Sequence, residues 1–106
     1  MDVSKEDDIK AAFSQGVAEF GRIDVVFNNA GFIVIGEVEG TSMEDARKTF
    51  DVLFWGAMQV SVEAIKTFRD VNGPELGGRL ITTTSLMGLV GGPTSGYYAA
   101  AKHGTL

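Results

Sequence analysis

Cysteine is absent from this sequence of 106 residues, and histidine occurs only once, as His103. Without cysteine the chain has no disulfide framework and no thiolate that could act as a nucleophile or a metal ligand. A single histidine does not make a metal site by itself. We therefore expect no metal centre, and the lack of disulfides suits a reducing, cytoplasmic compartment.

Basic residues and long apolar runs are also scarce. Lys and Arg total 9 against 14 Asp and Glu, and the formal net charge is −5. The few cations are scattered, so the chain offers no basic stripe for a phosphate backbone to follow. The most apolar window, residues 52–65, is interrupted by Gln59 and Glu63 and is too short to span a bilayer. We expect neither nucleic acid nor a membrane as a partner.

The remaining composition is that of an ordinary globular chain, with 44% hydrophobic and 22% charged residues. Ser4 and Asp7 resemble a capping box, and the acidic residues beside them suit the positive end of a helix dipole. Apolar residues then recur at steps of three and four up to Phe20, and Gly21 is a typical helix stop. The first predicted element is therefore a helix that ends at Phe20.

Two short runs rich in β-branched residues, 23–27 and 79–84, predict strands. The first reads as a strand covered on both faces, as in parallel sheets. Between the strands, Thr41 or Ser42 is expected to cap a long helix that ends near Val71. Its predicted inward stripe consists of Met43, Ala46, Phe50, Leu53, Phe54, Ala57, Ala64 and Phe68.

A second apolar set lies off that stripe, at Trp55, Met58, Val62 and Ile65. A helix that is apolar over so much of its circumference is covered on more than one side. The second cover is either another subunit or parts of a larger domain. The first alternative predicts a homo-oligomer formed through the long helix.

A strand, a long helix and a second strand form a right-handed βαβ unit with parallel, adjacent strands. The sequence therefore predicts an α/β fold with the element order α-β-α-β-α. Asn28 and Ser85 follow the two strands, so both are expected at the carboxyl edge of the sheet, where open α/β sheets bind ligands.

A tyrosine and a lysine close the predicted site. Tyr98 and Lys102 are four residues apart, and on a helix this spacing places an ammonium beside a phenol. A neighbouring cation favours the phenolate, so the pair can exchange protons with a substrate. Ser85 could bind the oxygen of a carbonyl or an alcohol. Tyr97 lacks this partner, because Ala101 lies four residues after it.

Together these features resemble the short-chain dehydrogenase/reductase family, through essentially the whole chain. The resemblance implies that residues 1–106 are a partial NAD(P)-binding domain with a Rossmann-like, doubly wound parallel sheet. The matching motifs occur in the family's order: Asp2-Val3, Asn28-Asn29-Ala30-Gly31, Ser85 and Tyr98-x-x-x-Lys102.

The resemblance also implies roles for individual residues. Tyr98 would be the general acid/base, Lys102 would assist it and bind the nicotinamide ribose, and Ser85 would bind the substrate oxygen. The cofactor would be NAD or NADP, and the substrate a small carbonyl compound or secondary alcohol. The remaining cofactor contacts would be Asp2 and Val3 at the adenine, Asn28, Ala30 and Gly31 at the adenosine ribose, and Thr83 at the nicotinamide end.

The sequence departs from the family in two respects. The family begins with a Gly-rich turn that binds the pyrophosphate, and it continues well beyond Lys102, so we expect these residues to belong to a longer polypeptide or to come from a truncated gene product. Leu53 stands where the family has an asparagine that binds a water linking the lysine to solvent, and leucine cannot make that link. The alternative to hydride transfer is therefore an inactive remnant, or an interaction module that uses the long helix 42–71.

Overall fold

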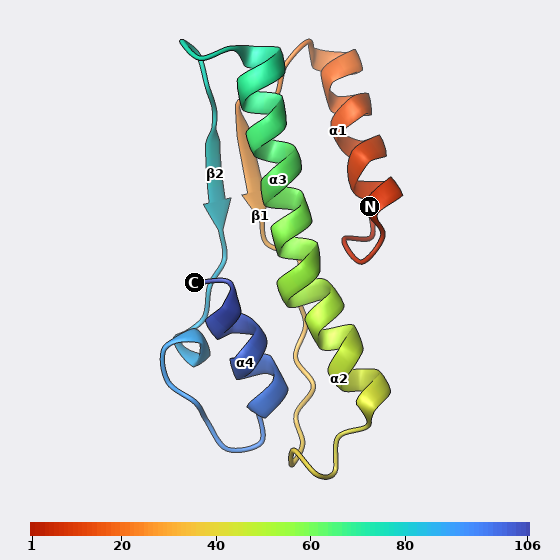
Figure 1. Cartoon of the computed structure of the whole chain (residues 1–106), viewed down its shortest axis with the longest axis vertical. Coiled ribbons are helices and arrows are strands. Elements are labelled where there is room, and N and C mark those ends of the chain that lie inside the picture. Colours follow the sequence, from red (N-terminus) through yellow and green to blue (C-terminus); the bar gives the residue numbers. More distant parts are fainter.

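The computed structural model describes all residues, 1–106, and contains the predicted order of helices and strands (Figure 1). The long helix is continuous from Met43 to Asn72 and consists of two α-helical and two π-helical segments. The elements are α1 (Glu6–Phe20), β1 (Val25–Asn28), α2 (Met43–Phe50), η1 (Asp51–Gly56), α3 (Ala57–Thr67), η2 (Phe68–Asn72), β2 (Arg79–Thr82), the 3-10 turn η3 (Leu86–Gly88) and α4 (Gly96–Gly104).

The two strands pair in parallel, which confirms the predicted strand-helix-strand unit. Val25 lies opposite Arg79, and Asn28 lies opposite Thr82. One further hydrogen bond extends the ladder beyond the strands, because the Thr83 N–H donates to the Asn28 carbonyl at 3.0 Å. Both strands therefore end at the same edge, and the segments that follow them leave the sheet side by side.

The start of α1 differs from the prediction. No side chain caps this helix, so the predicted capping box between Ser4 and Asp7 is wrong. Instead, the Ser4 hydroxyl and the Ser4 N–H both donate to Oδ1 of Asp2, at 2.7 Å and 2.9 Å. A carboxylate two residues upstream competes for the serine in an Asx-type turn. The predicted stop is confirmed, since Gly21 has a φ of 82° and donates to the Val17 carbonyl.

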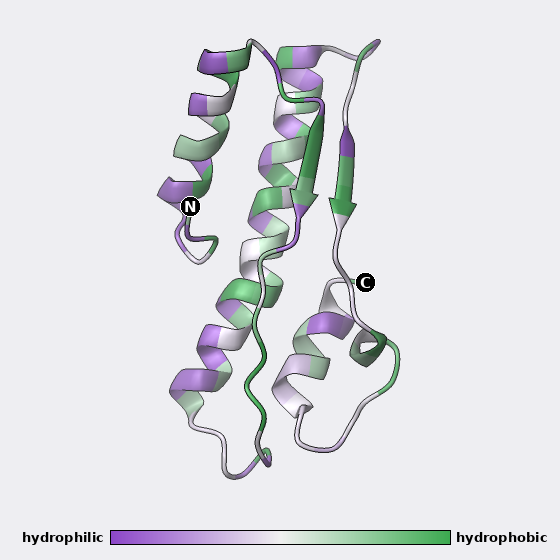
Figure 2. Cartoon of the chain, turned by 180° about the vertical axis from the view of Figure 1, so that it is seen from behind, coloured by the Kyte–Doolittle hydropathy of each residue, from purple (hydrophilic) through white to green (hydrophobic).

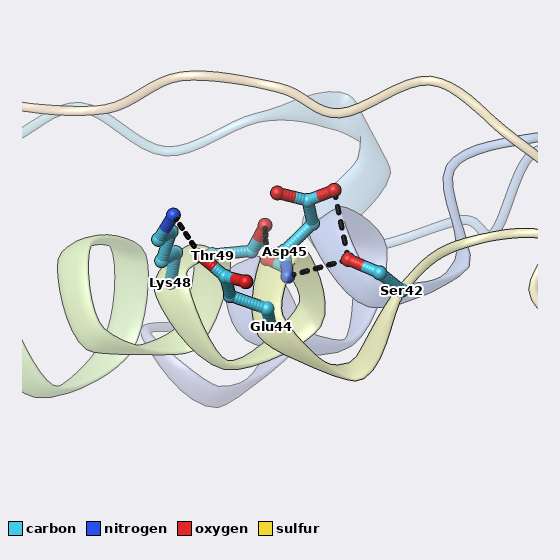
Figure 3. Close-up of polar contacts among 5 residues, drawn as sticks. All are labelled: Ser42, Glu44, Asp45, Lys48 and Thr49. Carbon is cyan, nitrogen blue, oxygen red and sulfur yellow. Dashed lines mark hydrogen bonds and ion pairs between the residues drawn. The ribbon is translucent and has the colours of Figure 1, made fainter.

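Ser42 caps the long helix, one of the two predicted positions. Its Oγ accepts the Asp45 N–H at 3.0 Å (Figure 3). In the following turn, Lys48 Nζ forms an ion pair with Glu44 Oε1 at 2.6 Å. The inward stripe is largely correct, because Ala46, Leu53, Ala57, Ala64 and Phe68 are buried. Met43 is an error in that stripe: it is exposed, since the first turn of α2 extends past the end of the strands (Figure 1).

The hydrophobic core lies between the sheet and the helices α1 and α3, on one face only. Strand β1 was expected to be covered on both faces, but Val25 and Phe27 are 53% and 64% exposed. The physical reason is that no element of this chain covers the face of the sheet that points away from α3. Figure 2 shows this face toward the viewer, with α3 behind the strands. The core residues are Val3, Ile9, Phe13, Val60, Ala64 and Phe68.

None of the helices combines the length and apolar character needed to cross a membrane.

Asn72 joins three parts of the chain at the end of the sheet opposite the carboxyl ends of the strands. Its amide Nδ2 donates to the Ile23 carbonyl and to the Gly77 carbonyl, both at 2.7 Å. The amide therefore ties the end of the long helix to the segment just before β1 and to the turn before β2. Its Oδ1 is buried without a partner, so the contribution of this side chain rests on its donor atom.

We expect Asn72→Asp to lower the free energy of unfolding by about 2–4 kcal/mol, because two part-buried carbonyls would face an acceptor in place of a donor. Urea unfolding followed by circular dichroism measures the loss. Asn29→Asp is the matched control: Asn29 is exposed and uses its Oδ1 as an acceptor, which aspartate retains. Equal stability of the two variants would contradict the bridging role of Asn72.

Candidate active site

Helix α4 carries Tyr98 and Lys102 and lies beside the carboxyl edge of the sheet (Figure 1). The Lys102 side chain is only 7% exposed, and its Nζ donates to the Thr83 carbonyl at 3.1 Å. The same Nζ lies 5.9 Å from the centre of the Tyr98 ring. The structure therefore brings the predicted tyrosine and lysine together and fixes the ammonium to the backbone just after β2.

The helix can approach this closely because of two glycines, Gly88 in the neighbouring η3 turn and Gly104 at the end of α4 itself. A Cβ on Gly88 would lie 3.0 Å from the Lys102 carbonyl oxygen. A Cβ on Gly104 would lie 2.8 Å from the ring of Phe54 on the long helix. Side chains at these two glycines would push α4 away from η3 and η1, so both positions help to set where Lys102 lies.

Two adjacent asparagines follow β1 and point to different places. Asn28 is buried, and its Nδ2 donates to the Ala57 carbonyl at 2.8 Å and to Ser61 Oγ at 3.2 Å. Its side chain thus fixes the long helix to the sheet and faces away from any ligand at the edge. Asn29 is exposed, and its Oδ1 accepts the Thr83 hydroxyl at 2.6 Å.

Asn29 is a site residue that the sequence reasoning missed. The sequence pattern that could have identified Asn29 is the geometry of a β-strand, in which successive side chains point to opposite faces of the sheet. Once Asn28 is assigned to the interior, Asn29 has to point the other way, toward the open edge.

A pocket of about 250 Å³ lies between the loop after β1, the loop after β2 and α4. Leu53 is 1% exposed and contributes a buried apolar side chain to its lining. Four of the predicted site residues contribute to this pocket: Gly31, Thr83, Tyr98 and Lys102. The remaining lining residues are Asn29, Phe32, Ile33, Leu53 and Thr84.

Ser85 and Ala30 do not line this pocket. Ser85 is half-buried, and its Oγ accepts the Met87 N–H at 3.2 Å, so it caps the η3 turn. Its hydroxyl donates no hydrogen bond within the chain. Ala30 is exposed in the loop that follows β1.

The predicted adenine contacts, Asp2 and Val3, differ in their surroundings. Val3 is a core residue, and its carbonyl lies so close to the long helix that a Cβ on Gly56 would be 2.7 Å away. Asp2 is exposed, and the hydrogen bond from the Ser4 hydroxyl, followed by that from the Ser4 N–H, lowers the pKa of its carboxyl below the ordinary value. A second cavity of about 290 Å³ adjoins Asp2 and shares Phe32 with the first.

This arrangement can hold a proton donor beside a fixed cation. The Lys102 ammonium uses one of its three hydrogens for the Thr83 carbonyl, which leaves donors for a phenolate or a ligand hydroxyl. Tyr98 is half-buried at the pocket, next to this charge. A carbonyl oxygen in the pocket could therefore receive a proton from the phenol, and an alcohol could return one.

A sequence model of the family described as short chain dehydrogenase matches residues 1–106. Among characterised and uncharacterised relatives, the chain is 35% identical to trans-4-hydroxycyclohexanecarboxylate dehydrogenase of Sinomonas cyclohexanicum, over 98% of this chain and 38% of that protein. It is 31% identical to an uncharacterized oxidoreductase of Schizosaccharomyces pombe, over 96% of this chain and 34% of that protein. The chain thus spans little more than a third of the length of these relatives.

Solved structures agree with the expected α/β fold. A short chain dehydrogenase from Mycobacterium smegmatis superimposes with a TM-score of 0.89 at 30% identity, covering 97% of this chain and 41% of the other. A short-chain type dehydrogenase/reductase from Mycobacterium marinum gives 0.90 at 24% identity, with 98% and 42% coverage. These overlaps confirm the parallel strand pair as part of a Rossmann-like sheet.

The contact between Gly31 and Leu53 yields a test of the pocket's geometry. A Cβ on Gly31 would lie 2.9 Å from Leu53 Cδ2, so Gly31→Ala should cost about 1–3 kcal/mol through overpacking. In a Leu53→Ala background the same change should cost clearly less, because the obstructing atom is gone. A urea double-mutant cycle measures this coupling.

Gly40→Ala is the control for an ordinary glycine substitution, because its Cβ would meet only van der Waals contacts. Additive effects of Gly31→Ala and Leu53→Ala would show that the loop after β1 does not rest on Leu53.

Proposed function

The chain belongs to the short-chain dehydrogenase/reductase family, and on this premise we propose that it supplies the proton-transfer site of an NAD(P)-dependent oxidoreductase. The reaction is hydride transfer between a nicotinamide and a carbonyl compound or secondary alcohol, carried out by the complete enzyme. One observation carries the proposal: the buried Lys102 ammonium is held by the Thr83 carbonyl beside the Tyr98 ring, at the carboxyl edge of two parallel strands.

The residues of this chain fit the two ends of a dinucleotide better than its middle. The pocket beside Lys102 offers an ammonium, the Thr83 hydroxyl and an asparagine, which suit ribose hydroxyls. The cavity at Asp2 is separated from it by Phe32 and suits the adenine end. For the pyrophosphate the fit is poor, because α1, which starts beside the cavity at Asp2, has three acidic residues in its first turn.

When bound in the complete enzyme, a nicotinamide would supply or accept the hydride at the substrate carbon. Tyr98 gives its phenolic proton to the carbonyl oxygen during reduction and takes the proton back during oxidation. Lys102 stabilises the phenolate that remains. Ser85 does not line this pocket and its oxygen already accepts the Met87 N–H, so its contact with the substrate oxygen stays a prediction from the family resemblance.

The pocket lining favours small, apolar substrates. Leu53, Phe32 and Ile33 have hydrocarbon side chains, and the polar residues of the lining lie just after the strand ends and on α4. A volume of about 250 Å³ is large enough for a ring of cyclohexane size, and the complete enzyme must add the space that the nicotinamide ribose needs. The 35% identical relative named for trans-4-hydroxycyclohexanecarboxylate is consistent with a cyclic secondary alcohol.

The role of Tyr98 is tested in a chimera in which residues 1–106 replace the matching segment of the Mycobacterium smegmatis enzyme. Tyr98→Phe should lower kcat/KM for NADH-dependent reduction of cyclohexanone by about 10²–10⁴-fold, the usual contribution of general acid catalysis. NADH absorbance follows the reaction. Tyr97→Phe is the matched control, because the residue four positions after Tyr97 is Ala101.

Equal activity of the two tyrosine variants would contradict the proposal. Without the remainder of the enzyme, the purified chain should show no turnover, since its own residues do not bind the pyrophosphate. Turnover by the purified chain would therefore overturn the inference that the cofactor site is incomplete.

A second candidate function uses the long helix as an interaction surface, with or without catalysis. Trp55, Val62 and Ile65 on this helix are 57%, 48% and 55% exposed, although each is large and apolar. Water-exposed apolar residues grouped on one helix favour a protein interface. We propose that this surface pairs with a second copy of the chain.

Sedimentation equilibrium tests this pairing. Val62→Asp should shift the purified chain from dimer to monomer at micromolar concentration, because a carboxylate would be buried in an apolar interface. Leu76→Asp is the matched control, since Leu76 is 64% exposed in the turn before β2. A wild-type chain that stays monomeric at all concentrations would exclude the long helix as a self-association surface.

A further inference from the structure

Thr94 has an unusual backbone conformation just before the helix that carries Tyr98. Its φ is 60°, and it is the only residue other than glycine with a positive φ. A β-branched residue is disfavoured there, since its Cβ is crowded by the backbone. Such a conformation persists only where the surrounding structure holds it, which makes the contacts of Thr94 informative.

The Thr94 carbonyl is the acceptor in a long-range backbone hydrogen bond. It accepts the Gly36 N–H at 2.9 Å and so attaches the loop of residues 32–40 to the start of α4. A second contact lies two residues further along both segments: a Cβ on Gly96 would be 2.6 Å from Val38 Cγ2. We call this pair of contacts the clasp, formed by Gly36 with Thr94 and by Val38 with Gly96.

The clasp joins two walls of the same pocket. Phe32 and Ile33, at the start of the clasped loop, line the pocket on one side. Tyr98, two residues after Gly96, lines it on the other. The distance between these walls is therefore limited by how the loop is attached to the residues before α4.

We propose that Thr94 is a positioning residue whose left-handed backbone directs its carbonyl to Gly36 and so sets the width of the pocket beside Tyr98. The Thr94 hydroxyl is not the link, because it donates to the neighbouring Pro93 carbonyl at 2.6 Å. The identity of the ligand in the pocket rests on the proposed function, whereas the existence of the clasp does not.

Two substitutions at Thr94 separate backbone conformation from side chain. Thr94→Gly permits the same φ and keeps the carbonyl, so amide hydrogen exchange of Gly36 should stay within about twofold of wild type, and Tm should rise. Thr94→Pro fixes φ near about −65°, and the Thr94 N–H that it removes makes no hydrogen bond. Exchange at Gly36 should then be at least about tenfold faster.

A rescue experiment addresses the second contact and does not depend on proline. Gly96→Ala should also speed exchange at Gly36, because the added methyl group meets Val38. Adding Val38→Ala to Gly96→Ala should restore slow exchange. An effect of alanine on α4 alone would persist in the double variant, whereas a clasp effect would disappear.

The link to the pocket is measured by titrating the variants with cyclohexanone and following the Tyr98 ring resonances by NMR. We expect the affinity to fall at least about threefold in Thr94→Pro and Gly96→Ala, and to recover in the Gly96→Ala, Val38→Ala double variant. Unchanged Gly36 exchange in Thr94→Pro and in Gly96→Ala would overturn the clasp. Faster exchange with unchanged affinity would overturn its control of the pocket.

The proposed function fails in a different way. A wild-type chain that binds no cyclohexanone, while Gly36 exchange follows the expected pattern, would contradict an apolar ketone site and would support the clasp.

Discussion

The candidate site depends on Thr83, which makes three hydrogen bonds, two with the end of β1 and one with α4. Its N–H donates to the Asn28 carbonyl, its hydroxyl to Asn29 Oδ1, and its own carbonyl accepts the Lys102 ammonium. The first bond continues the parallel ladder, the second joins the two strand ends, and the third attaches α4. The position of the ammonium is therefore set by main-chain geometry, which changes little with the side chains around it.

The long helix stabilises this arrangement through contacts with the end of β1 and with the pocket. Asn28 binds the Ala57 carbonyl and Ser61 on α3, and Leu53 contributes a buried side chain to the pocket. The π-helical segment Asp51–Gly56 includes Leu53 and ends one residue before Ala57. A π-helical turn changes the direction of the side chains that follow it, and such turns are frequent at functional sites.

Two groups of exposed apolar residues lie on the regular elements of this chain. One is the uncovered face of the sheet with Val25 and Phe27, and the other lies on the long helix around Trp55. Only 18 of 106 residues are buried, so much of the apolar area that drives folding still faces water. A partner that covers these faces therefore stabilises the folded chain. The free energy of unfolding consequently depends on which partner is bound.

The sequence by itself determined the order of elements, the parallel pairing and the meeting of Tyr98 with Lys102, because hydrophobic periodicity, helix stops and i, i+4 spacing act locally. Tertiary structure alone decided which asparagine faces inward, that Val3 belongs to the core and that Ser85 caps a turn outside the main pocket. Those outcomes depend on contacts such as Asn28 with Ala57, which are far apart in sequence and leave no local pattern. The clasp at Thr94 belongs to the same class, since a left-handed threonine is stabilised only by a loop about 60 residues earlier.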